Sequence, residues 1–226
     1  MTKPLLEAAR SIDRADPADV AALGAVPVGN VVDALGRTGA MVHMVKPVTK
    51  AQRFAGRALT VDAGPRDNLA PWAALRLAMP GDVLVITTGG HTGHSVCGDI
   101  LIGMAKNAGC VAIVTDGAVR DISGANAVGI PVFATAVTPN SPQKNGPGRV
   151  GLPIVCGGVA VAAGDIVCGD EDGVVVVPAA RIAEARTGLE AVRAKEVAME
   201  RAVADGAKAP DWIASVPLDE LFTFRD

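Results

Sequence analysis

The chain has 226 residues, half of them hydrophobic, and carries a net charge of −3. That length can bury a sizeable core in one domain. The 26 glycines, four phenylalanines, two tryptophans and absent tyrosines are typical of an α/β protein with tight turns and small-residue helices. The acidic balance and the 3% aromatic content exclude a basic or base-stacking nucleic-acid surface, so we expect no nucleic-acid partner.

The sequence shows no targeting or membrane segment. No apolar run approaches the roughly 18 residues that a spanning helix needs. Residues 1–16 include Glu7, Arg10 and Asp13, so they lack the apolar centre of a signal peptide. The four cysteines form no CxxC pair, which favours reduced thiols. We expect a cytoplasmic protein without a membrane partner. The high hydrophobic content also indicates that some apolar surface is buried against other subunits.

Helix and strand signals alternate along the first part of the chain. Pro17 and Pro27 are typical of helix starts, Gly36 is typical of a helix stop, and Asp67 is a candidate helix cap. The expected elements, in chain order, are two short helices within 17–36, a strand over 57–62, a helix over 68–79, a strand over 82–88, a helix over 98–108, a strand over 110–115, a helix over 121–128 and a strand over 131–134. This alternation predicts parallel pairing through right-handed crossovers.

The last third of the chain has a different pattern. Residues 138–151 are rich in proline and glycine and predict an exposed loop. Short strands are expected over 159–161, 166–167 and 174–177, with Asp170-Glu171-Asp172 as a tight turn. A long charged helix is expected over 179–206. We therefore expect a single domain over 1–226, in which 179–226 form a C-terminal helical extension.

Two polar groups follow neighbouring predicted strands. The first is a glycine-rich loop that runs into Asp99-Ile100-Leu101 at a helix start, where free N–H groups form an anion site. The second is the segment 116–121, with two carboxylates and a guanidinium. Ligands usually bind beyond the carboxyl ends of parallel strands. Carboxylate oxygens suit Mg²⁺ or Mn²⁺, and Arg120 could grip a substrate carboxylate. Together these groups could hold a 2-oxo acid and stabilise its enolate.

Each group also has a structural interpretation. Asp99 could serve only as a helix-start acid, and Arg120–Asp121 only as a surface ion pair. His91 and His94 lack an evident third ligand, and Cys97 lacks an assigned base. The residues by themselves indicate an α/β protein with an anion or metal site and leave these alternatives open.

The run from Gly81 to Val177 resembles the 4-hydroxy-4-methyl-2-oxoglutarate (4-carboxy-4-hydroxy-2-oxoadipate) aldolases, whose superfamily includes the regulator of ribonuclease activity A. The resemblance depends on Gly98-Asp99, then twenty residues, then Arg120-Asp121 within the run VTDGAVRD. It continues through Gly129-Ile130-Pro131-Val132-Phe133 and the segment 159–177. It implies an α/β/α swivelling-domain fold with a mixed, partly parallel sheet and a long C-terminal helix, assembled as a homotrimer or homohexamer.

The resemblance also implies roles for individual residues. Asp121 would bind the Mg²⁺ or Mn²⁺ cofactor directly, and Asp99 would hold water in the metal's shell. The backbone N–H groups of Ile100 and Leu101 would bind the pyruvyl carboxylate. Arg120 would contact the substrate and balance the developing enolate charge.

A glutamate of the C-terminal helix would complete a neighbouring subunit's site. Glu196 is the best candidate and Glu200 the second, although either could belong to a solvated helix face.

The resemblance implies a carbon–carbon lyase, a class II pyruvate aldolase that cleaves 4-hydroxy-2-oxo acids and decarboxylates oxaloacetate. The alternative is a non-catalytic, protein-binding regulator of ribonuclease activity. Such regulators are typically shorter and lack the C-terminal tail, which favours the enzyme. The loop from His91 to Cys97 matches no single family pattern, so the sequence leaves the physiological substrate open.

Overall fold

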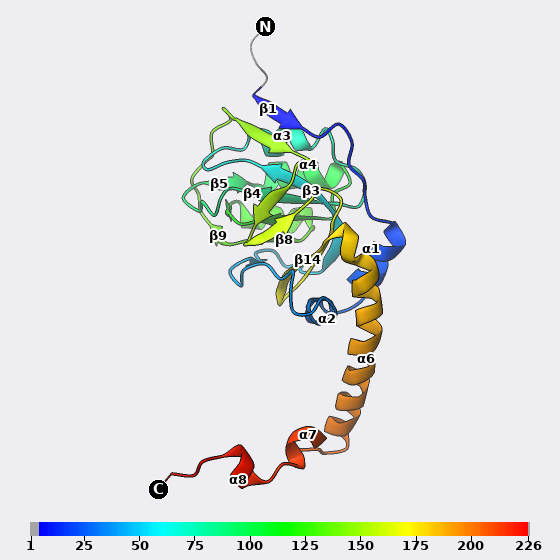
Figure 1. The fold of residues 1–226 in the computed structure, drawn as a ribbon. Coiled ribbons are helices and arrows are strands. Elements are labelled where there is room, and N and C mark those ends of the chain that lie inside the picture. The colour runs from blue at the N-terminus through cyan, green and yellow to red at the C-terminus, as the bar shows by residue number, and fades with distance from the viewer. Residues whose placement is uncertain (1–4, 226) are drawn as a thin grey trace.

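Four parallel strands form the centre of the main sheet in the computed structural model, which describes residues 5–225 (Figure 1). They are β3 (Phe54–Asp62), β4 (Asp82–Thr87), β6 (Ala112–Thr115) and β8 (Val132–Ala134). Antiparallel neighbours extend this centre: β10 (Gly148–Val150) and β13 (Ile166–Asp170) pair with β3, β2 (Lys46–Pro47) pairs with β8, and β14 (Gly173–Val177) pairs with β13. Strand β1 (Leu6–Ala8) lies parallel to β10 at the edge. The expected α/β fold with a mixed, partly parallel sheet is confirmed.

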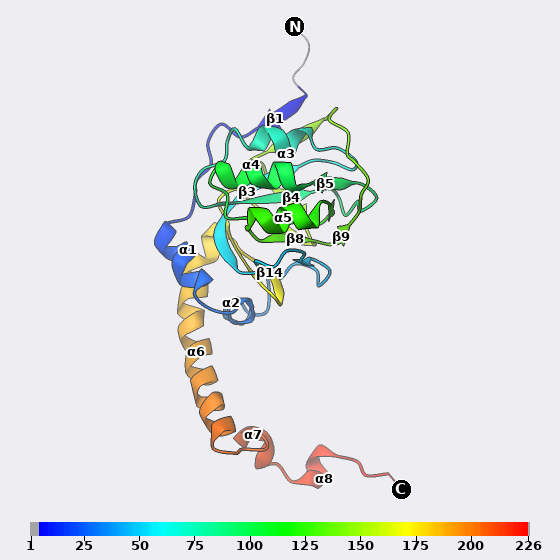
Figure 2. The same ribbon diagram turned by 180° about the vertical axis from the view of Figure 1, so that it is seen from behind.

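Both faces of the central strands are covered, as their continuous apolar sequences predict. All six residues of β4 are buried. Helices α3 (Leu69–Ala74), α4 (Asp99–Asn107) and α5 (Ile122–Val128) lie over one face, where Leu84, Ile102 and Ile113 share a core cluster (Figure 2). The hairpin of β11 (Ile154–Cys156) and β12 (Val159–Val161) contributes Ile154, Cys156 and Val161 to a second cluster that contains Phe133.

A third cluster joins the N-terminal helices to the start of the C-terminal helix. Helices α1 (Pro17–Gly24) and α2 (Val28–Ala34) pack with the first turns of α6 (Ile182–Ala204) against β13 and β14. The 3-10 turn η1 (Ala179–Arg181) precedes α6, and the short helices α7 (Asp211–Ala214) and α8 (Leu218–Leu221) follow it. The long C-terminal helix is therefore confirmed. Within residues 5–225, no helix is both long and apolar enough to cross a membrane.

The elements predicted from the sequence were wrong or incomplete at several short segments. The segment 138–151 is not all loop, because β10 lies at its end and pairs with β3. Helix α3 ends at Ala74, well before the expected position 79, although Asp67 does accept a hydrogen bond from Leu69 N at 2.8 Å. Strand β13 continues to Asp170, and the acidic turn that follows it is confirmed.

Candidate active site

A second, three-stranded parallel sheet positions the candidate site. Its strands β5 (Ser95–Cys97), β7 (Ala118–Val119) and β9 (Ala136–Val137) follow β4, β6 and β8 along the chain. Cys97 pairs with Val119, and Arg120 N donates to Cys97 O at 3.0 Å. This pairing brings Gly98-Asp99 beside Arg120-Asp121, although twenty residues separate them in sequence. The sequence signal for these strands is weak because segments of two or three residues show no periodicity.

Asp121 is held in an unusual backbone conformation. It precedes α5 with φ of 58° and ψ of 45°, the left-handed region that few residues other than glycine adopt. Its carboxylate does not cap α5. Instead, Arg120 Nε donates to Asp121 Oδ2 at 3.0 Å, and Arg120 also donates to Ser141 Oγ. The pair is partly exposed, with 36% and 42% of the two side chains accessible, so it faces a solvent-filled space rather than the core.

Two glycines make room for the two acidic side chains. A Cβ atom at Gly98 would collide with Asp121 Oδ2, and a Cβ atom at Gly124 would collide with the carboxyl group of Asp99. Neither glycine has a positive φ. Their role is therefore to let the carboxylates approach the backbone closely, and this packing restricts where both carboxylates lie.

The start of α4 supplies unpaired donors. Its cap residue Gly98 makes no side-chain cap, and the first helical bond runs from Ile102 N to Gly98 O at 3.1 Å. The N–H groups of Ile100 and Leu101 precede that bond, so they are free for an anion. Leu101 anchors the helix, since its side chain is 1% exposed, whereas Ile100 is 66% exposed.

These groups line one cavity of about 250 Å³. The expected residues Asp99, Ile100, Leu101, Arg120 and Asp121 all border it. The sequence alone assigned no role to five further polar residues of its wall, which are Asn68, Trp72, Ser95, Ser141 and Lys144. The motif DNL at 67–69 was the available signal for the first of them.

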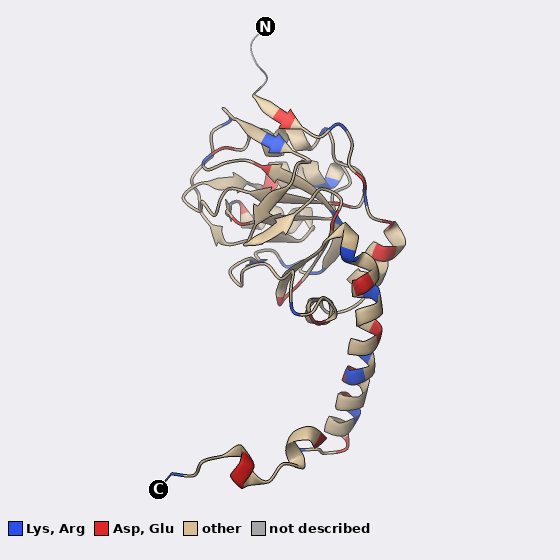
Figure 3. Cartoon of the chain, in the orientation of Figure 1, with Lys and Arg blue, Asp and Glu red and all other residues tan. Residues whose placement is uncertain are grey.

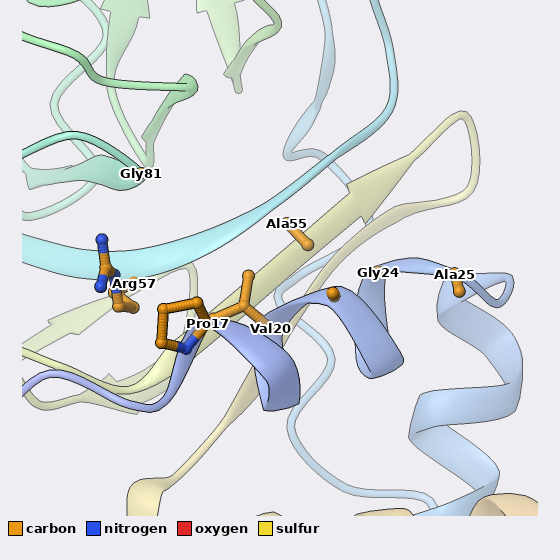
Figure 4. Close-up of a pocket in the computed structure, with 8 residues that line it drawn as sticks. Pro17, Val20, Gly24, Ala25, Ala55, Arg57 and Gly81 are labelled. Atoms are coloured by element: carbon orange, nitrogen blue, oxygen red, sulfur yellow. The ribbon is translucent and has the colours of Figure 1, made fainter.

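The largely apolar cavity beside α1 lacks this chemistry. It measures about 360 Å³ and is lined by Pro17, Val20 and neighbouring small residues (Figure 4). Its one charged side chain, Arg57, donates to Pro80 O and lies 3.9 Å from Asp82. No carboxylate of residues 5–225 borders this cavity, so the cavity that contains Asp121 is the better candidate for a metal-assisted site.

Several alternatives raised by the sequence are resolved by the geometry. Cys97 borders the candidate cavity, but burial raises the pKa of its thiol to about 12, so it stays protonated and weakly nucleophilic at neutral pH. His91 and His94 do not line the cavity; their rings face each other, with Nε2 and Nδ1 3.1 Å apart.

Asp116 has a structural role. Its carboxylate accepts from Thr87 Oγ1 at 2.8 Å and from Thr88 N at 2.7 Å, so it ties the end of β4 to the end of β6. It does not cap the turn at Gly117, whose N–H donates to Thr115 Oγ1.

Glu196 and Glu200 lie outside the cavity of their own chain. Both are exposed on α6, which leaves the body beside α1 and α2, at the end opposite β5 (Figures 1 and 2). Asn30 Nδ2 donates to Glu196 Oε2 at 2.5 Å. The expected role of a C-terminal glutamate in a neighbouring subunit stays a prediction.

The donor set fits a hard divalent cation that keeps most of its water. The residues from 5 to 225 contain no cluster of three or more His, Cys, Asp or Glu side chains that could hold a metal. A closed zinc site needs such a cluster. Mg²⁺ and Mn²⁺ instead accept one or two carboxylates and complete their shells with water and substrate, which matches Asp121 with Asp99 nearby.

Comparisons with known proteins identify relatives of this chain. A protein of Halalkalibacterium halodurans named "Putative 4-hydroxy-4-methyl-2-oxoglutarate aldolase" is 36% identical over 184 residues, which are 81% of this chain and 88% of that protein. The structure of Streptomyces coelicolor RraAS2, described as an unusual member of the RNase ES inhibitor RraA family, is 29% identical with a TM-score of 0.72. The match covers 83% of this chain and 100% of the RraAS2 chain.

The RNA-processing inhibitor RraA from Thermus thermophilis is 31% identical with a TM-score of 0.63. The match covers 93% of that chain but 68% of this one, so this chain has substantial segments without a counterpart there. The sequence profile described as RraA-like, Aldolase/RraA, matches residues 28–176. The chain therefore belongs to the Aldolase/RraA family.

Proposed function

We propose that this protein is a divalent-metal-dependent lyase that cleaves 4-hydroxy-2-oxo acids to pyruvate and a second carbonyl product, and that it also decarboxylates oxaloacetate. The observation that carries the proposal is the pairing of β5 with β7, which brings Asp99, Arg120, Asp121 and the free N–H groups of α4 to one cavity. The named aldolase relative supports the same reaction class.

Each residue of the site has its own role in the proposed reaction. The N–H groups of Ile100 and Leu101 bind the carboxylate of the 2-oxo acid at the positive end of the α4 dipole. Asp121 would hold Mg²⁺ or Mn²⁺ and Asp99 would help to position it; when bound, such a cation would polarise the 2-oxo carbonyl. Arg120 lies beside the Asp121 carboxylate. Its guanidinium balances the negative charge that develops on the 2-oxo oxygen as the enolate forms.

The same arrangement serves both reactions. In aldol cleavage the 4-hydroxyl loses its proton and the C3–C4 bond breaks. The electron pair forms the enolate of pyruvate, and a carbonyl product leaves. In decarboxylation the bond to the terminal carboxylate breaks, CO₂ leaves, and the same enolate forms without a base. In either case C3 then takes a proton to give pyruvate.

A neighbouring copy completes the site in this proposal. Helix α6 carries Glu196 away from its own cavity, and most of its residues are exposed. A homotrimer or homohexamer would let α6 of one subunit reach the cavity of another. Glu196 would then supply a carboxylate for proton transfer from the 4-hydroxyl.

Mixed oligomers test this shared site. Asp121→Asn and Glu196→Gln should each lack aldol cleavage when purified alone. Co-expression of the two should restore roughly a quarter of the wild-type sites, because random assembly pairs an intact cavity with an intact Glu196 at that frequency. No recovery in verified mixed oligomers would contradict the shared site.

Pyruvate release tests the function itself. The protein should release pyruvate from 4-hydroxy-4-methyl-2-oxoglutarate and from oxaloacetate with Mg²⁺ or Mn²⁺, and excess chelator should abolish both reactions. Release from oxaloacetate alone would restrict the proposal to decarboxylation.

The alternative is a non-catalytic regulator of ribonuclease activity, which the similarity to RraA structures supports. If neither acid is turned over, and the purified chain inhibits an endoribonuclease at stoichiometric concentration, the regulator replaces the enzyme.

A further inference from the structure

Two polar atoms in the cavity wall have no hydrogen-bond partner. They are Asn68 Oδ1 and Trp72 Nε1, and they are the buried side-chain nitrogen and oxygen atoms without a partner among residues 5–225. Both residues border the cavity that contains Asp121. An unpaired buried donor or acceptor costs free energy, so native proteins rarely leave one without a reason. Two such atoms in residues that border one cavity make this wall a candidate for contacts with a bound molecule.

The orientation of the Asn68 side chain is determined by its other bond. Asn68 Nδ2 donates to Val96 O at 3.2 Å, which leaves Oδ1 as the free acceptor. Asn68 is 5% exposed and directly precedes α3, whereas Val96 belongs to β5, just before Gly98-Asp99. The amide is therefore fixed to the same strand that positions the candidate catalytic groups.

The two free atoms have opposite hydrogen-bonding character. The indole Nε1–H of Trp72 only donates, and Asn68 Oδ1 only accepts. A carboxylate would place its oxygen against Oδ1, and an ammonium would place its protons against the indole N–H, so each satisfies only one of the two. A hydroxyl within reach of both atoms would satisfy both, because its oxygen would accept from Trp72 Nε1–H while its proton is donated to Asn68 Oδ1.

We propose that Asn68 and Trp72 together bind the 4-hydroxyl of the substrate and thereby select 4-hydroxy-2-oxo acids over 2-oxo acids that lack this group. The inference rests on the proposed function and adds a specificity-determining pair to it. Both residues border the cavity, and a hydroxyl that enters beside them would give each of the two shielded atoms its missing partner. Sites built to hydrogen-bond a hydroxyl discriminate strongly against analogues without it, because their polar groups are otherwise left unpaired.

The experiment compares two substrates in one variant. Trp72→Phe removes the N–H and keeps an aromatic ring. Trp212→Phe is the matched control at the chain's other tryptophan, which lies in α7 and is 72% exposed. For each protein, kcat/KM is measured with Mg²⁺ for 4-hydroxy-4-methyl-2-oxoglutarate and for oxaloacetate, which has no 4-hydroxyl. The readout is the ratio of the two values.

We expect Trp72→Phe to lower this ratio about tenfold, the effect of one lost hydrogen bond, and Trp212→Phe to leave it at the wild-type value. Asn68→Leu should lower the ratio similarly, and the double variant should lower it by less than the product, since both residues bond one hydroxyl. An equal loss in both reactions, or no loss in either, would overturn the inference. If the wild-type chain turns over neither acid, the proposed function fails, and this inference fails with it.

Discussion

The body of the molecule, residues 5–181, and its C-terminal arm, residues 182–225, are stabilised in different ways. In the body, three buried clusters surround the sheet, and the third also includes the first turns of α6. In the arm, α6 buries only Ala185 and Leu189, both near its start. Charged side chains of both signs follow one another along α6 (Figure 3). The arm also exposes large apolar side chains, namely Val197, Met199, Val203, Trp212, Leu218, Phe222 and Phe224.

Ion pairs show the same contrast. Arg14 binds both carboxylate oxygens of Asp82 at 2.9 Å, and the Asp82 side chain is fully buried. In the arm, Arg201 and Asp205 lie 3.9 Å apart and are 85% and 75% exposed. The body's own packing therefore forms the cavity, whereas these apolar side chains of the arm are exposed within residues 5–225. Substitutions in the two regions should therefore have very different effects.

The largest effect should come from the carboxylate that we assign to the metal. Asp121→Ala should lower kcat/KM for pyruvate release by about 1,000-fold or more, because the cation that stabilises the enolate loses its direct ligand. Asp219→Ala, which removes an acidic residue from α8 of the arm, is the control and should have wild-type activity. Full metal-dependent turnover by Asp121→Ala would show that the cation binds elsewhere.

The buried cysteines of the body should react much more slowly with thiol reagents in the folded protein than in the unfolded protein. Burial raises the pKa of both Cys97 and Cys168 to about 12. At pH 8 each should therefore carry roughly 1,000-fold less thiolate than a thiol with a pKa near 9. An aromatic disulfide reagent should label them slowly in buffer and rapidly in denaturant. Rapid labelling of the native protein would contradict their burial.

The same shift has a consequence for stability at alkaline pH. The folded-state pKa of each thiol lies above its unfolded value, so its contribution to stability is complete below about pH 9 and is lost as pH rises toward 12. The free energy of unfolding should fall across that window, by about 1.4 kcal/mol per pH unit for each thiol. Replacing Cys168 with Ala should reduce the slope.

Removing one partner of the buried ion pair should destabilise the body. Arg14→Ala leaves the Asp82 carboxylate buried with only Arg57, at 3.9 Å, as a nearby cation. We expect the free energy of unfolding to fall by about 3 kcal/mol in urea denaturation. Arg201→Ala in the arm should cost less than about 0.5 kcal/mol. Equal effects of the two substitutions would contradict the contrast between the regions.

The smallest effect should follow removal of the end of the arm. A chain that ends at Gly206 lacks α7 and α8, which contribute no buried residue. The free energy of unfolding of the body should change by less than about 1 kcal/mol in urea denaturation. Analytical ultracentrifugation of the same variant should show whether the removed apolar side chains bind a second copy. A large loss of stability together with dissociation would show that the arm stabilises the body through an oligomer.

The sequence by itself determined the class of fold and most of the candidate site. Buried runs such as 82–88 and the glycine and proline signals between them were sufficient to predict the parallel centre of the sheet, because each signal is local. The motif Gly98-Asp99 with Arg120-Asp121 was recognisable from its twenty-residue spacing and the residues that flank it, which resemble those of the aldolases. Helix α6 was predictable from its length and charge.

Only the tertiary structure decided how these parts meet. Strands β5, β7 and β9 are too short for a periodic signal, and they form because the ends of β4, β6 and β8 lie side by side. The same long-range pairing shows why Gly98 and Gly124 must lack side chains. It also places Asn68 and Trp72 in the cavity wall with unpaired polar atoms. Sequence records residue types and local spacing, whereas contacts between distant segments depend on the register and packing of the whole sheet.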